Sequence, residues 1–258
     1  MEKFREWRNG PDMHNDPTPQ ARNLYLGKCS AEARYKSMPT VIAAPSCFCG
    51  PLQGVNREIQ DSLLKAVKRS PPPPQHRTKI RPEQLGMIIK VGSTDSDPEV
   101  IQAAALALIQ FKALLRISEA QALRVPDVKS THNDVWHVSI PKSKTDQHAK
   151  GTVVAIRFNA QERALLNKYL STLGNATFLF QSGSTGLPLA LSTLRDGLRH
   201  ISSKANLQWF NITSHSFRGG AATQALSMIA HQMDVMQAGR WKTLGGFQNR
   251  VYISRPSF

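Results

Sequence analysis

The C-terminal half of this chain carries side chains whose types and order suit metal-free attack on a phosphodiester bond. In sequence order they are Arg116, Lys144, His215, Arg218, Trp241 and Tyr252. Guanidinium groups match the charged non-bridging oxygens of a phosphate, because their planar fork can donate two hydrogen bonds at once. A leaving alkoxide needs a proton, and an attacking phenol must lose one. These residues therefore predict a site that cleaves phosphodiester bonds by nucleophilic attack.

Arg116 falls at the junction of two predicted helices, and Glu119 follows in the first turn of the second helix. A carboxylate at that place could stabilise the helix N-terminus and hold a neighbouring basic group. An ordinary solvated arginine beside a capping glutamate would produce the same local pattern. The functional interpretation of this pair therefore depends on the residues that accompany it.

Lys144 lies in the polar segment PKSKTDQHAKG, which joins two predicted strands. A lysine on the tip of a β-hairpin can swing over a bound strand and give its proton to a leaving oxygen. Lys142 and Lys150 lie in the same loop and could take this role instead. Surface lysines are also common in loops that have no catalytic function.

His215 and Arg218 are spaced three residues apart at the start of a predicted helix, so both side chains should point to one face. Thr213 or Ser214 could cap this helix, whose free N–H groups and positive dipole end would favour a phosphate. A histidine that only caps a core helix is the alternative. The spacing thus predicts a phosphate beside the start of this helix.

Five segments carry these residues, namely ALLRISEAQALRVPDV, SIPKSKTD, TSHSFRGGAATQAL, GRW and NRVYISR, and together they resemble the tyrosine recombinase/integrase family. The resemblance covers roughly residues 80 to 258. It implies that Arg116 and Arg218 bind the scissile phosphate, and that Glu119 belongs to the same catalytic set. It also implies that Lys144 is the general acid for the leaving oxygen.

The same resemblance assigns roles to the other residues of the set. His215 would assist proton transfer, and Trp241, whose indole N–H can only donate, would bond a phosphate oxygen, pack in the core, or do both. Tyr252 would attack phosphorus and form a 3'-phosphotyrosine that preserves the bond energy for rejoining. The interval from Trp241 to Tyr252 is eleven residues, longer than the family pattern, and six residues follow Tyr252. So short an end predicts that the C-terminal helix exchanged between many relatives is missing.

Hydrophobic periodicity predicts a mainly helical α+β domain with a small β-hairpin, in agreement with the catalytic domain that the resemblance implies. Asp97 and Pro98 should begin an alanine- and leucine-rich helix, and Ser118 with Gln121 should cap the next one. Helices are predicted at 98–115, 118–125, 159–170, 190–202 and 214–230, and the hairpin strands at 135–140 and 152–158.

The chain before this domain divides into two segments. Residues 1–53 are rich in Pro, Asn, Arg and small residues without a sustained period, which predicts an irregular N-terminal arm. Residues 54–80 combine a predicted helix, with Val55 and Ile59 on its apolar face, and a basic Pro-rich linker. They resemble the remnant of an incomplete helical core-binding domain, and the catalytic domain would occupy residues 81–258. The linker could lie along a phosphate backbone or remain a solvated spacer.

The composition bounds the partners and the compartment. A formal net charge of +15 favours a polyanionic partner, here double-stranded DNA. The charged start MEKFREWRNG is no secretory signal, and no run of about 18 apolar residues suggests a membrane span. Cys47 and Cys49 could be half of a metal site, but without a second pair they indicate free thiols in a reducing, intracellular setting. No metal and no small-molecule cofactor are expected.

The sequence therefore predicts a site-specific recombinase or integrase that cleaves and rejoins DNA strands and self-associates on its substrate. The segments LKAVKRSPPPP and HSFRGGAAT are similar to those in integrases of eukaryotic mobile elements of the DIRS- and Crypton-like group, which would place the chain in the nucleus. One alternative is a domesticated mobile-element protein that binds DNA but has lost catalysis. A type IB topoisomerase, which shares the catalytic residue set, is a third interpretation.

Overall fold

The computed structural model of the chain describes residues 18–32, 38–69, 78–131, 135–141, 151–183, 185–228 and 230–248. Lys144, Tyr252 and the proline run at 71–74 lie outside these ranges. The chain forms two units, Met1–Gln75 and His76–Phe258, each with a hydrophobic core of its own. None of the described helices is long and apolar enough to cross a membrane.

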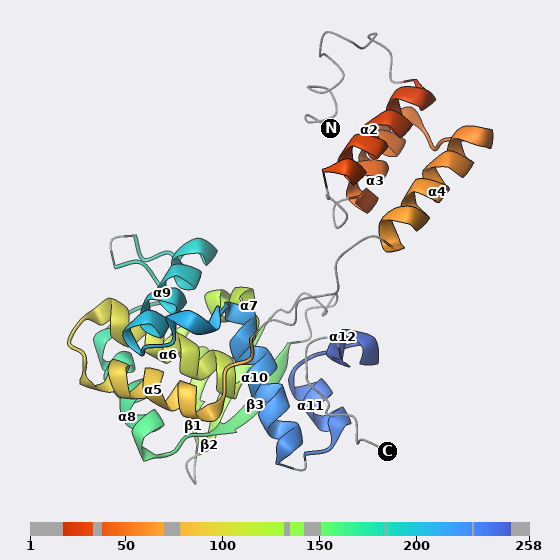
Figure 1. Cartoon of the computed structure of the whole chain (residues 1–258). Helices are drawn as coiled ribbons and strands as arrows, with labels where there is room; N and C mark the ends of the chain where they lie inside the picture. The colour runs from red at the N-terminus through yellow and green to blue at the C-terminus, as the bar shows by residue number, and fades with distance from the viewer. Residues whose placement is uncertain are drawn as a thin grey trace. The chain divides into compact units, whose positions relative to one another are not determined.

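The described part of the N-terminal unit contains the helices α2 (Pro19–Ala31), α3 (Met38–Cys49) and α4 (Gly54–Arg69) (Figure 1). The prediction of an irregular arm over residues 1–53 is therefore wrong for the segments that form α2 and α3. Thr18 caps α2 by accepting the Ala21 N–H at 3.2 Å, and Pro19 at the first helical position has a backbone preset for a helix. A shared core then stabilises helices whose own sequences show little periodicity. Its buried members are Tyr25, Leu26, Cys29, Met38 and Val67.

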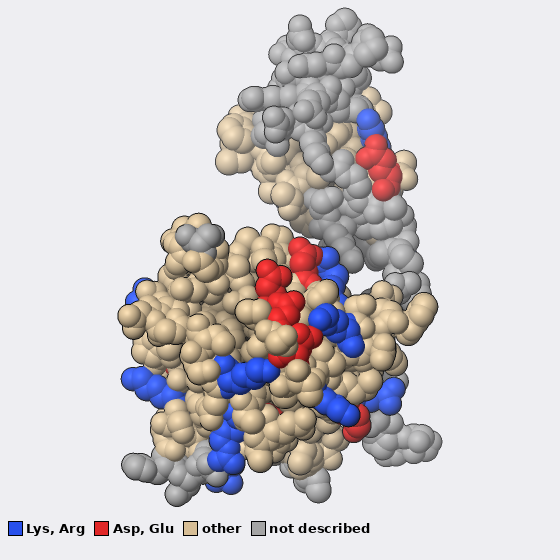
Figure 2. All heavy atoms as spheres, turned by 90° about the vertical axis from the view of Figure 1, so that its left-hand side faces the viewer, with Lys and Arg blue, Asp and Glu red and all other residues tan. Residues whose placement is uncertain are grey.

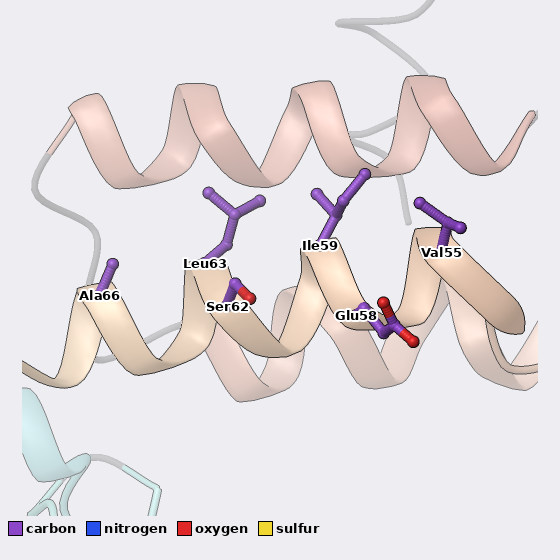
Figure 3. A pocket seen from close by; sticks show the side chains of 6 residues that line it. All are labelled: Val55, Glu58, Ile59, Ser62, Leu63 and Ala66. Atoms are coloured by element: carbon purple, nitrogen blue, oxygen red, sulfur yellow. The ribbon is translucent and has the colours of Figure 1, made fainter.

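The helix predicted after residue 53 is confirmed as α4, but its apolar face is only partly covered. Val67 is buried in the core of the unit, whereas Val55 is 68% and Ile59 is 43% exposed. These two side chains project from one face of α4 beside Leu63 and line a shallow pocket of about 520 Å³ (Figure 3). The described residues of this unit thus leave part of the predicted apolar face open.

The C-terminal unit is built around helix α6 (Pro98–Lys112). This helix is packed between α5 (Pro82–Thr94), α8 (Ala160–Thr172), α9 (Leu191–Lys204) and α10 (Ser214–Ser227) (Figure 1). Buried residues occur all round α6, as expected of a helix that others cover on every side. Asp97 accepts the Glu99 N–H at 2.9 Å and Pro98 occupies the first helical position, so the predicted start of this helix is confirmed.

A three-stranded antiparallel sheet completes the described part of the C-terminal unit. Its strands are β1 (Val128–Ser130), β2 (Val135–Ile140) and β3 (Thr152–Arg157), in the order β1-β2-β3. Val138 at the centre of β2 lies opposite Val128 on one side and Val154 on the other, and all three are buried. The hairpin of β2 and β3 and the mainly helical α+β class are as predicted. Strand β1 was missed because three residues are too few to show an alternating pattern.

Helix α7 (Ile117–Ala122) directly follows Arg116, which is its N-cap. The predicted capping pair of Ser118 and Gln121 is therefore wrong. The Arg116 N–H donates to Glu119 Oε2 at 2.9 Å, so the glutamate at the third helical position makes the reciprocal capping bond. Gln121 donates instead to a backbone carbonyl across the unit at 2.7 Å. The start of α7 is thus tied to the candidate site through Arg116 and Glu119.

Helices α6, α9 and α11 (Gln232–Ala238) end in the same kind of turn. One residue adopts the left-handed backbone conformation, and the next N–H donates back to a carbonyl five residues earlier. The left-handed residues are Leu114 (φ 49°), Asn206 (φ 57°) and Arg240 (φ 58°). Glycine is the usual occupant, because a side chain in this conformation costs about 1–2 kcal/mol. The chain continues from α11 through Trp241 to the last described helix, α12 (Leu244–Gln248).

Candidate active site

The candidate site is centred on a buried carboxylate surrounded by guanidinium groups. Glu119, whose side chain is 2% exposed, lies 2.5 Å from Arg116 Nη1 through Oε1 and 2.7 Å from Arg240 Nη2 through Oε2. Arg218 Nη1 is 3.6 Å from the same Oε2 atom. Three positive charges therefore face a single negative charge. The excess suits a bound anion such as a phosphate, because the local field remains positive after Glu119 has been paired.

Arg116 is the member of this cluster that can most easily meet a ligand. Its side chain is 18% exposed, against 3% for Arg218 and 6% for Arg240. The N-cap position at the start of α7 places it between two packed helices, α6 and α7, which fix its backbone. Its second terminal nitrogen, Nη2, donates to the Arg240 carbonyl at 3.3 Å. The arginine is thus anchored through both terminal nitrogens, while part of its side chain remains exposed.

Arg218 lies deeper than the sequence pattern suggested. Its Nη1 donates to the Leu114 carbonyl at 3.0 Å, and its Nη2 donates to the Gly239 carbonyl. The guanidinium carbon lies 4.2 Å from the centre of the Trp241 ring, a cation–π contact. Both terminal nitrogens therefore donate to backbone carbonyls in the turns that end α6 and α11.

Trp241 supports the cluster from the α11 side. Its ring is half-buried and packs edge-on against Phe247 of α12, with centroids 5.1 Å apart. Gly239 is required beside it, because a Cβ atom there would overlap the six-membered part of the indole. Trp241 therefore packs in the core while one face of its ring meets Arg218. Of the roles considered for Trp241, packing in the core is observed, and its ring also contacts the cluster.

The environment of Glu119 keeps its carboxylate ionised. Burial alone would raise the pKa of Glu119, because desolvation disfavours the charged form. The charge and hydrogen bond of Arg240, followed by the backbone and side-chain hydrogen bonds of Arg116, outweigh the burial and hold this pKa below its usual range. The cluster thus keeps its one negative charge at neutral pH.

His215 faces a different environment from that of Arg218, although both belong to the first turns of α10. It is half-buried and lines a groove of about 790 Å³ between the start of α10 and helix α9. Arg195 and Arg199 of α9 line the same groove, and both are exposed. No acidic residue is among the described residues that line it. The groove is therefore basic and open to solvent, whereas the cluster around Glu119 is buried.

The start of α10 is held by bonds from segments distant in the sequence. The Ile80 N–H donates to the Ser216 carbonyl at 3.2 Å, and a Cβ atom at Gly220 would overlap the Ile80 carbonyl. Gln110 of α6 donates to the Ser214 carbonyl at 3.0 Å. The Thr213 N–H donates to Ser216 Oγ at 2.9 Å, which identifies Thr213 as the N-cap. Of the two predicted caps, Thr213 is the one observed.

The structure brings together four of the seven residues predicted for the site. Those four are Arg116, Glu119, Arg218 and Trp241. His215 lines the neighbouring groove, while Lys144 and Tyr252 lie outside the described residues, as do the competing Lys142 and Lys150. Within the described residues, no three His, Cys, Asp or Glu side chains gather as metal ligands would.

The sequence interpretation missed Arg240. This residue directly precedes Trp241 in the segment GRW, so it stood beside a predicted site residue. Its partner Glu119 lies 121 residues earlier, and that contact leaves no local signal in the sequence. Arg195 and Arg199 were likewise not singled out, although their spacing of four residues places them on one face of a predicted helix.

Comparison with solved structures shows that the fold is similar to the folds of several integrases and recombinases. The Tn1549 transposon integrase in complex with circular intermediate DNA matches with a TM-score of 0.68 at 14% identity, over 98% of this chain and 88% of that chain. A lambda integrase dimer bound to a COC' core site matches with a TM-score of 0.63 at 13% identity, over 100% and 88%. The XerA recombinase matches with a TM-score of 0.56 at 16% identity, over 98% and 84%. At such identities the likeness is one of fold.

The sequence itself matches a family description over most of the C-terminal unit. Residues 78–251 match the Phage integrase family, and this range contains six of the seven predicted site residues and ends directly before the seventh, Tyr252. No curated protein sequence matches the chain significantly. The family match, covering more than half of the chain, agrees with the fold and with the cluster around Glu119. The chain therefore belongs to the phage integrase family.

Proposed function

We propose that this chain is a tyrosine recombinase that cleaves and rejoins DNA through a 3'-phosphotyrosine intermediate. The observation that carries the proposal is the cluster of three arginines around one buried carboxylate, next to Trp241, in a phage integrase fold. Preorganised positive groups stabilise the charge that grows on a phosphate during its transfer. Arg116 is the group placed to meet that phosphate first, because it has the most exposed side chain of the three.

The other catalytic roles follow from the chemistry that the reaction needs. Tyr252 would be the nucleophile and Lys144 the general acid, while His215 at the edge of the groove would assist proton transfer. Arg218 would raise the positive potential from beneath the phosphate. It would contact a phosphate oxygen directly once its bonds to the Leu114 and Gly239 carbonyls were exchanged for that oxygen.

The proposed partner is double-stranded DNA, bound with self-association. The net charge of +15 and the basic groove beside His215 favour a phosphate backbone. Figure 2 shows that one face of the C-terminal unit carries a group of acidic residues with Lys and Arg residues around it. Such a mixed face is a poor site for a polyanion. Among the similar structures, the lambda integrase is a dimer on a core site and XerH recombinase is bound to its difH substrate, which supports DNA binding by an assembly.

The type of integrase and the compartment in which it acts are also part of the proposal. The segments LKAVKRSPPPP and HSFRGGAAT favour an integrase of a eukaryotic mobile element, which would act in the nucleus. One observation favours a second function, that of a domesticated protein that binds DNA without cutting it. Arg218 is buried, and both of its terminal nitrogens are occupied by backbone carbonyls. A catalytic arginine locked in this state would leave DNA binding intact and cleavage impaired.

A nicked suicide DNA substrate separates these functions, because an attacking tyrosine is trapped on the cut strand as a covalent protein–DNA band. We expect the wild-type chain to form this band and Tyr252→Phe to lose it, with DNA affinity nearly unchanged because only the attacking hydroxyl is removed. Tyr169→Phe is the matched control. The Tyr169 hydroxyl donates to the Leu179 carbonyl at 2.5 Å, and burial raises its pKa, so it is a poor nucleophile.

The control variant should therefore still form the covalent band. A wild-type chain that binds DNA tightly yet never forms the band would support the DNA-binding alternative. A band that persists in Tyr252→Phe would show that another residue is the nucleophile.

A further inference from the structure

Arg240 occupies a backbone position that normally favours glycine. It is the left-handed residue at the end of α11, with φ of 58°. Its side chain is 6% exposed, so it does not face solvent as an ordinary surface arginine would. A glycine at this position would avoid the steric cost of the left-handed conformation. The side chain of Arg240 therefore has to supply interactions that a glycine could not.

Those interactions join the junction of α6 and α7 to the end of α11, which follows more than 100 residues later in the sequence. Arg240 Nη2 donates to Glu119 Oε2 at 2.7 Å and to the Leu114 carbonyl at 2.9 Å. Its Nη1 donates to the Ala238 carbonyl at 2.7 Å, and its own carbonyl accepts Arg116 Nη2 at 3.3 Å. The end of α6, the first turn of α7 and the end of α11 are thus held at one guanidinium group.

We propose that Arg240 is a positioning residue, which sets the direction of the Glu119 carboxylate and thereby keeps the exposed part of the Arg116 side chain available to a phosphate. Arg240 bonds to Oε2 of Glu119, which also accepts the Arg116 backbone N–H, and the Arg116 guanidinium bonds to Oε1. Without Arg240, Oε2 would keep only the backbone bond and could accept a second one, so the Arg116 fork would turn inward to bind both carboxylate oxygens in the bidentate manner that this pair prefers. The guanidinium that faces a phosphate would be withdrawn from it.

Arg240 also fixes the residue that follows it. Trp241 N–H donates to the Met236 carbonyl at 2.9 Å, which closes the left-handed turn at Arg240. Trp241 then stacks on Arg218, so the same turn determines how the indole meets the cluster. The catalytic consequence rests on the proposed recombinase function, whereas the control of Glu119 by Arg240 can be measured without it.

The test uses Arg240→Gly, because glycine adopts the left-handed conformation and removes only the guanidinium. Asn206→Gly is the matched control, since Asn206 is the exposed left-handed residue at the end of α9 and belongs to no part of the site. At saturating DNA, we expect Arg240→Gly to lower the rate of covalent band formation by roughly 10-fold to 100-fold, as for residues that orient catalytic ligands. Arg240→Lys, which keeps a positive charge, should recover part of this loss, and Asn206→Gly should cleave at the wild-type rate.

A second readout follows the Glu119 carboxyl in the free protein, by NMR titration of chains with carbon-13-labelled glutamate. Arg240 is the largest influence that lowers the pKa of Glu119, so this pKa should rise in Arg240→Gly and stay unchanged in Asn206→Gly. A residue that only stabilised the fold would not move it. Arg240→Lys gives the same measurement should the glycine variant unfold, with a smaller rise expected.

The two readouts separate the inference from the proposed function. If the wild type forms no covalent band but the pKa of Glu119 rises in Arg240→Gly, the recombinase proposal fails and the positioning role of Arg240 stands. If the variant titrates like the wild type at Glu119, or cleaves DNA at the wild-type rate, the positioning role is overturned. A loss of cleavage without a change at Glu119 would also overturn it, because Arg240 would then act by another route.

Discussion

His215 and Arg218 lie one turn apart on α10, yet they belong to two regions with opposite properties. His215 lines an open groove with the exposed Arg195 and Arg199. Arg218 lies in a closed cluster where Glu119 is 2% exposed. Charges in the groove are screened by salt over about 8 Å, whereas charges in the cluster are screened far less. The same residue types therefore act as a diffuse attraction in one region and as fixed, strong contacts in the other.

This difference determines what a substitution in each region should change. The cluster connects the ends of α6 and α11 with the start of α7, so its residues should influence both the stability of the fold and the proposed DNA cleavage. The exposed groove arginines, Arg195 and Arg199, should influence DNA affinity far more than folding. The predictions below follow this contrast from the largest expected effect to the smallest.

The largest effect is expected from Glu119→Ala. This variant leaves three guanidinium groups close together and without their shared carboxylate. Breaking a buried ion pair in this way costs about 3–5 kcal/mol, because the remaining charge is neither solvated nor paired. The free energy of unfolding, measured by urea titration at neutral pH, should fall by that amount.

Glu162→Ala is the matched control for Glu119→Ala. Glu162 is also a buried capping glutamate at the third position of a helix, but it pairs with a single lysine, Lys112, at 2.7 Å. That lysine is 26% exposed and can turn to solvent when its partner is removed. Glu162→Ala should therefore lower the free energy of unfolding clearly less than Glu119→Ala does. If the free energy of unfolding fell equally in the two variants, the surplus of positive charge in the cluster would not contribute to the cost of removing Glu119.

The next effect is the pH dependence of stability that Glu119 produces. Because its pKa in the folded chain lies below the usual value, its stabilising contribution is present above about pH 4.3, the ordinary pKa of a glutamate. The contribution is lost as pH falls from there through the lower pKa of the folded state. In urea titrations at a series of pH values, the wild type should lose stability in this acid range more steeply than Glu119→Gln. Parallel curves would show that Glu119 is not held ionised by its partners.

A smaller effect should follow from Gly220→Ala, which tests whether α10 is rigidly held between the two regions. The added Cβ would overlap the Ile80 carbonyl, so backbone must move, at a cost of about 1–3 kcal/mol. Gly197→Ala in α9 is the control, because its Cβ would meet Ala103 at an ordinary 3.5 Å. That change should stabilise the helix by about 0.5–1 kcal/mol. Thermal unfolding should therefore move in opposite directions for the two variants.

These contrasts also explain how far the sequence could predict the molecule. Helix α6, the β2–β3 hairpin and the start of α10 were predictable, because their caps and periodic patterns are local. The pair Asp97–Pro98 at the start of α6 is one such signal. Arg116 and Glu119 could be placed at a helix start for the same reason, since the two residues are three positions apart.

What could not be predicted depends on contacts between distant segments. Arg218 was expected to face a phosphate together with His215, yet its partners are the Leu114 and Gly239 carbonyls, which left-handed turns at the ends of two other helices bring to it. A left-handed Leu114 or Arg240 has no signature, because glycine is the residue that normally marks such a turn. Helices α2 and α3 were missed because their stability comes from a shared core and not from their own periodicity.

The smallest effect on stability is expected in the groove, where Arg195→Gln and Arg199→Gln should change the free energy of unfolding by no more than about 0.5 kcal/mol. Both side chains are exposed, and Arg199 pairs with Asp196, which is also exposed. Their loss should appear in DNA binding. Each arginine that contacts a phosphate releases about one counterion, so the slope of log affinity against log salt should become shallower by roughly 1 per substitution.

Asp196→Asn is the control for these two variants. It removes the carboxylate that competes for Arg199 at 2.5 Å, so DNA affinity at low salt should rise where the arginine variants lower it. Fluorescence anisotropy with a labelled duplex at several salt concentrations measures all three slopes. If the arginine variants kept the wild-type slope while Asp196→Asn changed nothing, the groove would not lie on the DNA. The proposed DNA-binding region would then have to lie elsewhere than in this groove.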